Sequence, residues 1–455
     1  MLITSSTNMM PHTVVNPQDA IEEALSKAGR VRASFAQTPT RLRSAALAKI
    51  ADAIASDSED LARLIVSEGI KTIREARSEV SRAQQTFRVA GEACVTFTGE
   101  LIDFERTEAG AGRWGHSERR PLGVVLGVTP YNDPLNLVAH KIAPAIAVGA
   151  PVIIKPHEAT PTPALRLAQY ADRTDLPSDA VQVVQGGPAD VRRMASDPRV
   201  RVVSFTGGSK AGLAVARAAV GKVTLLELGG IGASYVHADA NAAKAAQDLA
   251  PGIVWAGGQN CVHTQHVVVH RAVANDLCKH LIAALSAMRC GDRLSEATDV
   301  ARQISRDSAN SLDSLIDSAV QTGTTELVRV RCDDPQTVGP CLLGEVPAYH
   351  PVAAEEVFGP IAVLSIVDSL DEAVQHVQCL GPSINTSIFS DSISAVRTWH
   401  HATDSGTTVV NDSTDFRVDH MPFGGNGMAG VGREGVRSAM NAISAPRVLV
   451  MRAGA

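Results

Sequence analysis

Hydrophobic and polar positions follow two different periods along the chain. Residues 16–100 place apolar side chains three and four positions apart, for example over 43–54 and 61–65, which predicts amphipathic helices with solvated charged faces. From residue 123 the pattern changes to short apolar runs, each ended by proline or glycine, that alternate with helical segments. The predicted strands are 123–129, 151–155, 181–184, 202–205 and 223–228, and the predicted helices are 135–148, 165–171, 191–195 and 209–220.

This alternation predicts a doubly wound parallel sheet, because strand, helix and strand form the crossover unit of such sheets. A second run follows Gly229-Gly230, with strands at 265–269, 361–366 and 408–411 and helices at 272–288, 307–322 and 370–377. The sequence has no internal repeat, low-complexity block or long linker. We therefore expect two α/β units packed on each other, preceded by a loose tail at residues 1–15.

Composition limits the classes of protein to which this chain can belong. The 455 residues are 45% hydrophobic and 20% charged, and 48 acidic against 42 basic residues give a formal net charge of −6, so no basic excess is present for binding nucleic acid. The apolar stretch 142–154 has 13 residues with two prolines, whereas a membrane-spanning helix needs about 20. The N-terminus shows no secretory signal, so we expect a cytoplasmic protein that does not use a membrane.

Cys261 stands apart from the other six cysteines of the sequence. It directly follows the glycine-rich turn Trp255-Ala-Gly-Gly-Gln-Asn and precedes an apolar strand, a setting that exposes a thiol beside backbone N–H donors, as a nucleophile requires. A buried core cysteine is the alternative interpretation. The seven cysteines include no C-x-x-C pair, which argues against a disulfide framework or a thiolate zinc site.

Two polar residues interrupt the predicted strands or follow them directly. Glu227 lies near the end of the otherwise apolar strand 223–228, and a buried carboxylate is costly unless it is partnered or neutral, so it is either a structural ion pair or a base with a raised pKa. Asn132 follows strand 123–129 at its carboxyl end, where parallel sheets build their sites. Its amide is a candidate oxyanion donor or an ordinary turn residue.

The glycine-rich segment 205–212, FTGGSKAG, follows a strand and opens a helix. A helix N-terminus offers free N–H groups to an anion, but the segment is neither G-x-G-x-x-G nor a P-loop, and any strand-to-helix turn needs small residues. Phosphate contact and a purely steric role therefore both stay open. His263 and His266 would point to opposite faces of a strand, so we expect no metal site.

Taken in order, the motifs resemble those of the aldehyde dehydrogenase superfamily, of the non-phosphorylating kind. The resemblance runs from about residue 16 almost to the end, and Cys261 lies 34 positions after Glu227, as the family's nucleophile and base do. The matching motifs are PYNDPL (130–135), Lys141, IIKPHEATP (153–161), FTGGSKAG (205–212), LELGG (226–230), GGQNC (257–261), EEVFGP (355–360), Asn411 and MPFGGNGMAGVGREG (421–435).

The resemblance implies an architecture of three parts. These are a Rossmann-type cofactor domain (1–102 and 122–228), a second α/β catalytic domain (229–430), and a small β oligomerisation hairpin with bridging segments (103–121 and 431–455). The end segment 445–451 is apolar and has no evident partner within the chain, so we expect it to pair across an interface in a homodimer or homotetramer.

The resemblance also implies a mechanism. Cys261 attacks the aldehyde carbon, and the alkoxide is held by the Asn132 amide and the Cys261 backbone N–H. Hydride passes to the nicotinamide, and the remaining thioester is hydrolysed by water that Glu227 deprotonates. Lys141 matches a lysine near the base that supports its proton traffic. We therefore expect an enzyme that oxidises a small polar aldehyde to its acid with NAD.

Thirteen positions match the family's cofactor-binding residues: Thr129, Pro130, Tyr131, Lys155, Glu158, Gly187, Phe205, Thr206, Gly207, Gly208, Leu228, Glu356 and Phe358. By resemblance, Lys155 and Glu158 hydrogen-bond the adenosine ribose. A carboxylate at Glu158 repels a 2′-phosphate and favours NAD over NADP. His157 replaces a usually small residue beside it and could alter this pocket, so NADP stays possible.

The substrate is the least defined part of the prediction. The family's aldehyde tunnel corresponds to Tyr131, Trp255, Asn260, Val262 and Phe416, and candidates for an anionic tail are Arg120, Arg417 and His420, each of which is otherwise a surface or interface residue. The segment DPLNLVAHK resembles that of enzymes for small hydroxylated or carboxylated aldehydes such as lactaldehyde. Relatives that take phosphonate- or phosphate-bearing aldehydes often place arginine where this chain has Asn260.

Three alternative functions remain. A CoA-acylating dehydrogenase would share the thiol and the thioester but would need no base for water, so the presence of Glu227 argues against it. A dehydrogenase for a phosphonate- or phosphate-bearing aldehyde is disfavoured by Asn260 without being excluded. A silent structural homologue is disfavoured because thiol, base and amide are all present.

Overall fold

The N-terminal helices form where the apolar spacing predicts them. The computed structural model describes residues 17–452, so the predicted tail at 1–15 lies outside the described residues. Thr72 begins the longest helix with a capping box, in which its side chain accepts from the Glu75 N–H and the Glu75 carboxylate accepts from the Thr72 N–H. These helices are α1 (Pro17–Ala36), α2 (Thr40–Ser56), α3 (Ser58–Glu68) and α4 (Ile73–Thr96).

The first α/β unit is built on a six-stranded sheet with the order β14-β6-β5-β2-β3-β4. All pairs are parallel except the one between β14 and β6. Hydrophobic cores lie on both faces, with α2 to α6 on one face and α1, α7 and α8 on the other. The elements are β2 (Val124–Val128), α5 (Asn136–Val148), β3 (Val152–Lys155), α6 (Thr162–Asp172), β4 (Val181–Val183), α7 (Pro188–Ser196), β5 (Val200–Thr206), α8 (Ser209–Ala218), β6 (Val223–Glu227) and β14 (Gly430–Val431).

The second unit has a seven-stranded sheet with the order β13-β12-β7-β8-β11-β10-β9. Only β9 runs antiparallel to its neighbour. Its strands are β7 (Gly232–Val236), β8 (Thr264–His270), β9 (Thr325–Arg329), β10 (Cys341–Gly344), β11 (Ile361–Val367), β12 (Ser383–Phe389) and β13 (Ser405–Val410). Its helices are α9 (Ala242–Val254), α10 (Arg271–Ser286), α11 (Arg306–Gln321), α12 (Pro351–Ala354), α13 (Leu370–Cys379) and α14 (Ile393–Ala402).

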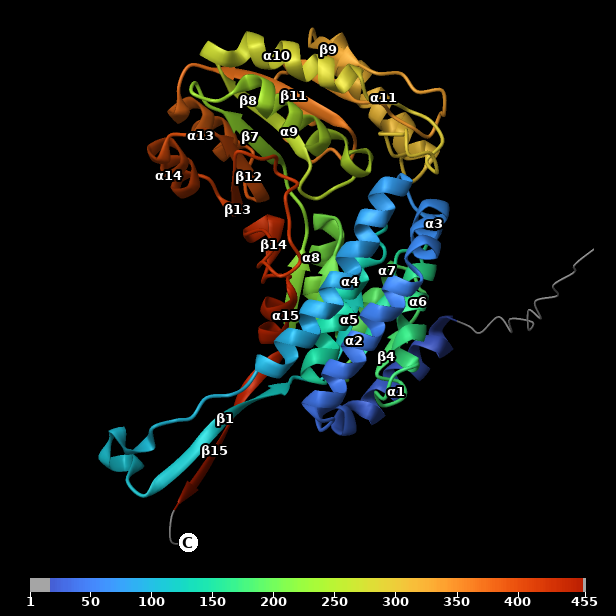
Figure 1. Ribbon diagram of the computed structural model, residues 1–455, viewed down its shortest axis with the longest axis vertical. Coiled ribbons are helices and arrows are strands. Elements are labelled where there is room, and N and C mark those ends of the chain that lie inside the picture. Colours follow the sequence, from blue (N-terminus) through green and yellow to red (C-terminus); the bar gives the residue numbers. More distant parts are fainter. Residues whose placement is uncertain (1–16, 453–455) are drawn as a thin grey trace, which may run out of the picture.

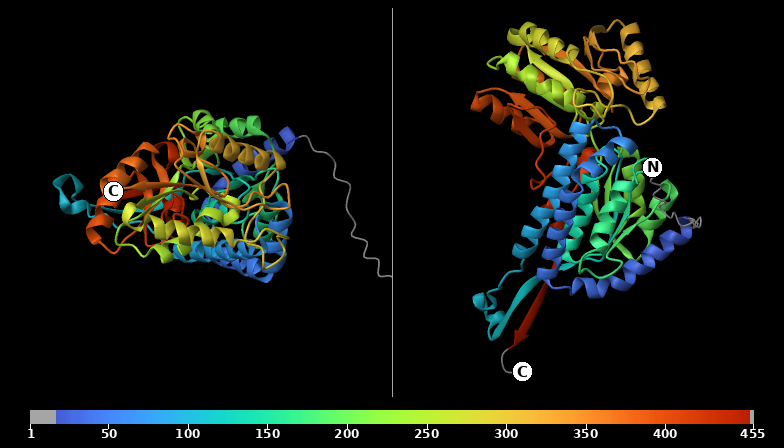
Figure 2. Two further views of the ribbon diagram at one scale, coloured as in Figure 1. Left: turned by 90° about the horizontal axis from the view of Figure 1, so that it is seen from above. Right: turned by 45° about the vertical axis from the view of Figure 1, so that its right-hand side comes forward.

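The two units lie one above the other in Figure 1, and a long two-stranded arm, called the hairpin below, projects from the lower one. Figure 2 shows the same arrangement from two further sides. The chain enters the upper unit after β6 and returns to the lower one at β14, whose Gly430 lies opposite Glu227. No helix within residues 17–452 is long and apolar enough to cross a membrane.

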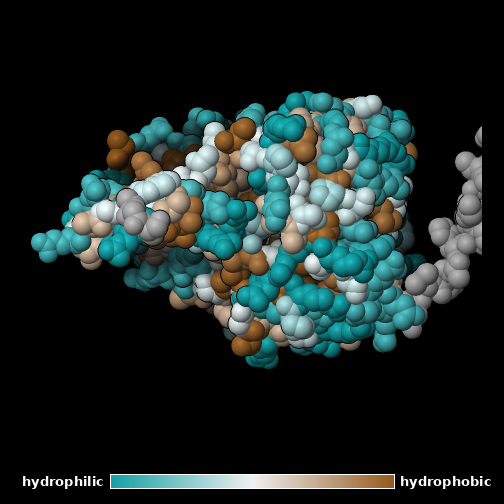
Figure 3. All heavy atoms as spheres, turned by 90° about the horizontal axis from the view of Figure 1, so that it is seen from below, coloured by the Kyte–Doolittle hydropathy of each residue, from teal (hydrophilic) through white to brown (hydrophobic). Residues whose placement is uncertain are grey.

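The projecting hairpin corrects one prediction from the sequence. The C-terminal strand β15 (Ser444–Arg452) was expected to lack a partner within the chain, but it pairs antiparallel with β1 (Arg113–Pro121). Within residues 17–452, no second layer covers the apolar side chains of these two strands. Trp114 of β1 is 56% exposed, and Val448 and Val450 of β15 are 51% and 50% exposed. Figure 3 looks at this end of the molecule, where hydrophobic residues show on the projecting arm among hydrophilic ones.

The predicted oligomerisation and bridging segment 431–455, described as far as Arg452, divides between the first unit and the hairpin. Val431 belongs to β14 in the first sheet, and α15 (Val436–Ala442) packs its Val436 and Met440 into the core of the first unit. Only β15 contributes to the hairpin. The chain therefore completes the first unit before it enters the projecting arm.

The cysteines provide a second correction. Cys290 and Cys332 are joined by a disulfide, although the absence of a C-x-x-C pair argued against one. The partners are 42 residues apart in sequence, and the fold brings their Cα atoms to 5.6 Å. Sequence spacing alone gives no signal for such a pair. The remaining five cysteines, Cys261 among them, are free.

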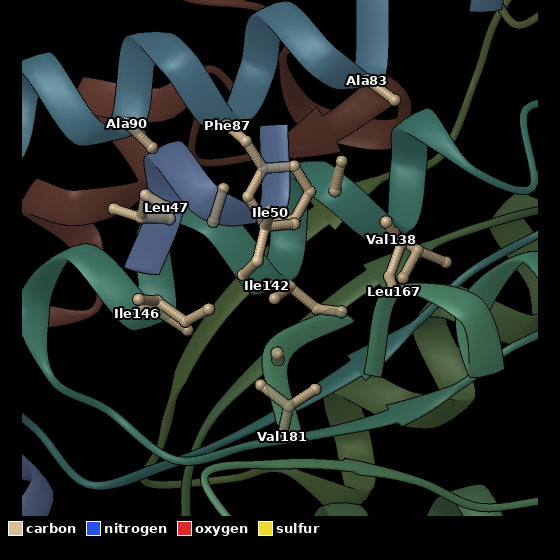
Figure 4. Close-up of a cluster of buried hydrophobic side chains, with 14 of the residues drawn as sticks. Leu47, Ile50, Ala83, Phe87, Ala90, Val138, Ile142, Ile146, Leu167 and Val181 are labelled. Atoms are coloured by element: carbon tan, nitrogen blue, oxygen red, sulfur yellow. The ribbon is translucent and has the colours of Figure 1, made fainter. Parts of the chain in front are cut away.

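The largest core lies where α4 crosses α2 and α5 above the first sheet. Phe87 is fully buried there and points from α4 toward Ile50 and Ile142, as Figure 4 shows. Burial of this ring contributes strongly to stability because interiors are packed as densely as organic crystals. The core fixes α5, the helix that carries Lys141.

We predict that Phe87→Ala lowers the free energy of unfolding by about 3–5 kcal/mol, because the change removes buried apolar surface and leaves a cavity. Urea unfolding followed by circular dichroism measures this loss. Val95→Ala on the same helix is the control, since Val95 is 56% exposed and its truncation should cost no more than about 0.5 kcal/mol. Equal losses in the two variants would contradict the assignment of Phe87 to the core.

Candidate active site

The candidate residues of the first unit gather at the carboxyl ends of its parallel strands. The strand register sets Val128 beside Lys155 and Phe205, and Thr206 beside Glu227. Thr129 continues the same edge, because its N–H donates to the Lys155 carbonyl oxygen at 3.2 Å. Parallel sheets present their functional side chains at this edge.

A cavity of about 590 Å³ lies between this edge and the second unit. Residues of both units line it, so the site exists only when the two are packed together. The predicted site residues that line the cavity are Pro130, Tyr131, Asn132, Thr206, Gly207, Gly208, Glu227, Leu228, Trp255, Asn260, Cys261, Val262, Glu356, Phe358, Phe416 and Arg417.

The other predicted residues lie outside the cavity wall, for different reasons. Lys141 is buried directly behind the wall, where it contacts Thr206. Thr129, Phe205 and Lys155 stand at the strand ends, with Glu158 and Gly187 in turns that follow β3 and β4.

Two of the three predicted tail-binding residues are corrected by the structure. Arg120 lies in β1 of the hairpin, opposite Ala445, and pairs with Glu118 at 2.7 Å. His420 is exposed, and its neighbour Asp419 is the residue that turns inward. Neither lines the cavity described within residues 17–452, whereas Arg417 does.

Cys261 is presented by a turn that only small residues can form. Ala256, Gly257 and Gly258 are all left-handed, with φ of 54°, 63° and 69°. A Cβ at Gly258 would lie 2.1 Å from the Gly359 backbone, so the turn packs directly against the EEVFGP segment. The N–H of Ala256 donates to the Glu75 carboxylate at 2.8 Å, which anchors the turn to the start of α4.

The sulfur of Cys261 borders the cavity beside an apolar group formed by Val262, Ile384 and Phe423. The surrounding protein raises the pKa of the Cys261 thiol by withholding water, and the positive charge of Arg417 opposes that shift. Asn260 lies next to the sulfur, with its Oδ1 3.9 Å from Sγ. The charge of Arg417 therefore favours the thiolate form of Cys261.

Glu227 and Glu434 lie close together inside the protein and have opposite properties. Burial raises the pKa of Glu227 well above its ordinary value, and the charge of Glu434 raises it further. Within residues 17–452, its Oε1 accepts only from the Glu434 N–H at 3.3 Å, and its Oε2 has no partner. Its raised pKa makes the Glu227 carboxylate, once ionised, a stronger base than an exposed carboxylate.

Glu434 is the ionised member of the pair. Burial alone would raise its pKa, but Lys141, His140 and Arg417 hold the pKa of Glu434 down at about 2. Its Oε1 accepts from Arg417 Nη2 at 2.7 Å, and its Oε2 lies 3.4 Å from Lys141 Nζ. Arg417 and Lys141 therefore contact Glu434 and leave Glu227 without a salt bridge within residues 17–452.

Lys141 reaches this position because Gly127 of β2 has no side chain to obstruct it. A Cβ on Gly127 of that strand would lie 3.1 Å from the Lys141 Cδ, so a larger residue would press on the side chain. The ammonium also donates to Ser204 Oγ at 3.2 Å and Thr206 Oγ1 at 2.9 Å. These contacts fix it between the base strand and Glu434.

Asn132 is buried at the cavity wall. Its Nδ2 donates to the Gln259 carbonyl oxygen at 2.9 Å, two residues before Cys261. The amide nitrogen carries a second hydrogen, and Asn132 lines the same cavity as the sulfur. The Asn132 amide is therefore held against the turn that carries Cys261, and one of its two N–H groups makes no hydrogen bond within residues 17–452.

A dinucleotide fits the residues at this edge. The Thr129 hydroxyl is buried without a hydrogen-bond partner in the described chain. Cβ atoms built on Gly187 and Gly208 would meet nothing within 4 Å, and Gly208 precedes α8, whose N-terminus favours an anion. Tyr131 and Phe358 meet edge to face at 6.4 Å, beside Glu356, which accepts from the Gly230 N–H at 3.2 Å. Residues 17–452 contain no cluster of histidine, cysteine, aspartate and glutamate suited to a metal ion.

Several cavity residues were missed by the sequence argument. Asp412 and Asp415 follow the carboxyl end of β13, so the rule applied to Asn132 would also have indicated them. Glu434 stands in the quoted GREG motif but received no role. Arg82, on α4, gives no local signal because only the tertiary fold brings it to the cavity.

Comparison with known proteins agrees with this geometry. Residues 7–449 match the model of the aldehyde dehydrogenase family. Aspartate-semialdehyde dehydrogenase 1 of Pseudomonas canavaninivorans is 34% identical over 91% of this chain and 88% of its own length. The 3-sulfolactaldehyde dehydrogenase of Priestia aryabhattai is 32% identical over 89% of this chain and 85% of its own.

Solved structures confirm the predicted fold class. Aldehyde dehydrogenase 21 of Physcomitrella patens, in complex with the reaction product succinate, has a TM-score of 0.91 at 31% identity over 97% of this chain and 92% of that one. A glyceraldehyde-3-phosphate dehydrogenase of Methanocaldococcus jannaschii, complexed with NADP, has a TM-score of 0.91 at 28% identity over 96% and 95%. The chain therefore belongs to the aldehyde dehydrogenase family, with NAD(P) as its cofactor.

Proposed function

We propose that this protein oxidises a small polar aldehyde to the carboxylic acid, with Cys261 as nucleophile and Glu227 as the base that activates water. One observation carries the proposal: Cys261, Glu227 and Asn132 line one cavity together with eight of the thirteen residues assigned to the cofactor. The names of relatives, which act on aspartate semialdehyde, sulfolactaldehyde and lactaldehyde, support a small substrate with a polar tail.

The first half of the reaction takes place on the sulfur. The Cys261 thiolate adds to the aldehyde carbon and forms a thiohemiacetal. The spare amide hydrogen of Asn132 and the backbone N–H of Cys261 stabilise its oxyanion. NAD(P), when bound, accepts the hydride that leaves this carbon, and a thioester on Cys261 remains.

The second half of the reaction needs an activated water. Glu227 takes a proton from water, which attacks the thioester and releases the acid and the thiol. Lys141 and Glu434 stand next to Glu227, within the hydrogen-bonded group that also holds Arg417. They are placed to stabilise the change of charge on Glu227 as it gains the proton.

Hydrolysis is favoured over transfer to coenzyme A because a buried carboxyl with no competing salt bridge lies in the cavity. Transfer to a thiol would give that carboxyl no function. A dianionic phosphonate or phosphate tail is also disfavoured, since Asn260 stands next to the sulfur and the cavity wall carries Asp412 and Asp415.

We propose NAD rather than NADP as the preferred cofactor. Glu158 is exposed in the turn after β3, and its charge acts on Lys155 at the end of that strand. By resemblance this turn meets the adenosine ribose. An added 2′-phosphate there would face a carboxylate.

We also propose that the hairpin assembles the protein into a homo-oligomer. A two-stranded sheet is only marginally stable alone, and β1 and β15 form such a sheet. The outer edge of β1 is bridged by Leu101 opposite His116, whereas the outer edge of β15 is unpaired within residues 17–452. The exposed Trp114, Val448 and Val450 give the sheet an apolar surface. A second copy of the chain would cover both the β15 edge and this surface.

We predict that Glu227→Gln retains a first burst of NADH equal to the enzyme concentration but lowers steady turnover by about 10²–10⁴-fold, because only hydrolysis needs the base. Rapid-mixing absorbance at 340 nm separates the two phases. Since burial and Glu434 raise the pKa of Glu227, wild-type hydrolysis should fall as the pH drops through that pKa.

Cys261→Ser should abolish both phases, whereas Cys379→Ser, at an exposed free cysteine, should change neither. Equal loss of burst and turnover in Glu227→Gln would contradict its role. Product analysis without coenzyme A completes the test, because the proposal requires free acid and excludes a thioester product.

We predict that the wild-type protein has a higher kcat/KM with NAD than with NADP, and that Glu158→Ser raises the relative use of NADP at least about fivefold. This corresponds to about 1 kcal/mol of repulsion between unit charges about 4 Å apart in water. Initial rates with both cofactors at a fixed aldehyde concentration measure the ratio. Glu105→Ser in the hairpin arm is the control, and the same shift in both variants would refute the assignment.

We predict that a double change, Val448→Asp with Val450→Asp, reduces the molar mass in solution toward that of one chain. The two side chains lie on one face of β15, and burying their carboxylates in an interface would be costly. Light scattering coupled to size exclusion gives the mass. Val220→Asp is the control because Val220 is 81% exposed outside the hairpin. A wild-type monomer would refute the proposal directly.

A further inference from the structure

The part of the cavity wall formed by residues 412–417 carries both positive and negative side chains. Asp412, Asp415 and Arg417 all line the cavity and follow strand β13. Trp255 and Phe416 supply apolar surface beside them. A tail that meets this wall therefore encounters one cation and two anions within a short stretch of chain.

Arg417 has donor capacity that the protein does not use. Its Nη2 donates to Glu434 at 2.7 Å and lies 3.1 Å from His140 Nε2, and its guanidinium carbon lies 3.8 Å from the centre of the Phe423 ring. The side chain is only 8% exposed, and its buried Nε makes no hydrogen bond within residues 17–452. An unpaired buried donor is costly, and because Arg417 lines the cavity, a small rotation of its guanidinium would bring this donor to a ligand carboxylate.

Within residues 17–452, neither Asp412 nor Asp415 forms a salt bridge with a lysine or arginine. Asp415 accepts from the Ser413 hydroxyl, and the negative charge of Asp412 acts on it. Asp412 accepts from the Ser413 N–H at 2.8 Å. By contrast, the deeper carboxylates Asp133, Asp419 and Glu434 all pair with lysine or arginine. The two outer carboxylates repel each other until a cation separates them.

We propose that the substrate tail is zwitterionic: an aldehyde on the side chain of a short α-amino acid, with its carboxylate on Arg417 and its ammonium on Asp412 and Asp415. This inference rests on the proposed function and specifies its substrate class. Each turnover converts the aldehyde and one water into the acid, with two electrons passing to NAD as hydride, and leaves both tail charges unchanged.

A substrate tail with a single charge would pair either with Arg417 or with the two aspartates, but not with both. A carboxylate alone would bind Arg417 but would bring a third anion near Asp412 and Asp415. An ammonium alone would bind the aspartates and leave the Arg417 Nε unpaired. The neutral aldehyde would use neither set, so the two charges should contribute separately to kcat/KM.

Four aldehydes separate these contributions: aspartate semialdehyde, succinate semialdehyde without the ammonium, 3-aminopropanal without the carboxylate, and propanal with neither. We expect kcat/KM with NAD to be highest for aspartate semialdehyde, by about tenfold or more over each singly charged analogue, and lowest for propanal. An equal or higher value for succinate semialdehyde would overturn the ammonium contact. An equal or higher value for 3-aminopropanal would overturn the carboxylate contact.

Variants assign the contacts to residues. Asp415→Asn should reduce the preference for aspartate semialdehyde over succinate semialdehyde by about tenfold, because it removes a charge that only the ammonium uses. Arg417→Lys should reduce the preference over 3-aminopropanal. Asp371→Asn, at an exposed position of α13, should leave both preferences unchanged. Unaltered preferences in the cavity variants would overturn the assignment.

The panel also distinguishes failure of this inference from failure of the proposed function. Turnover of all four aldehydes in a different order would overturn the zwitterionic tail and leave aldehyde oxidation intact. Absence of NADH with every aldehyde, for protein that shows wild-type circular dichroism, would overturn both.

Discussion

The site depends on the unequal sharing of two cations between two buried carboxyl groups. Glu434 is held ionised by Lys141 and Arg417, while Glu227 receives only a backbone N–H. If both were ionised, two like charges would face each other with little water to screen them. Glu434 therefore carries its charge more readily, and Glu227, with its raised pKa, is the stronger base of the two when it is ionised.

The fold meets this requirement by returning to its first sheet. Glu227 ends β6, and Gly430 of β14 pairs directly with it. That return brings Glu434 beneath the base and carries Arg417 in from the second unit. The same crossing explains the close glycine at position 424, where a Cβ would lie 2.6 Å from the Glu227 carboxylate. The charged group thus forms only when both units are complete and correctly packed.

The sequence predicts the strands and the motif residues, but it does not predict contacts between segments that are far apart in the chain. The apolar runs identify the strands, and the strand-end rule together with the family motifs indicates Cys261, Glu227 and Asn132, which the structure brings to one cavity. Arg82, 50 positions before Asn132, reaches that cavity only because α4 crosses the strand ends. The pairing of β15 with β1 and the bond between Cys290 and Cys332 join segments far apart in the chain. No periodicity records such contacts, because each depends on the assembled fold.

Arg417 connects the chemistry to the choice of substrate, since one guanidinium neutralises Glu434 and also borders the aldehyde cavity. An anion bound to its free Nε would compete with Glu434 for the same charge. Other buried cations limit this effect, because Lys141 also lies beside Glu434 and Arg82 pairs with the neighbouring Asp419. An ammonium held by Asp412 and Asp415 would offset the added negative charge further. A tail carrying both charges is therefore the kind that this wall can bind with the least disturbance of the pair on which catalysis depends.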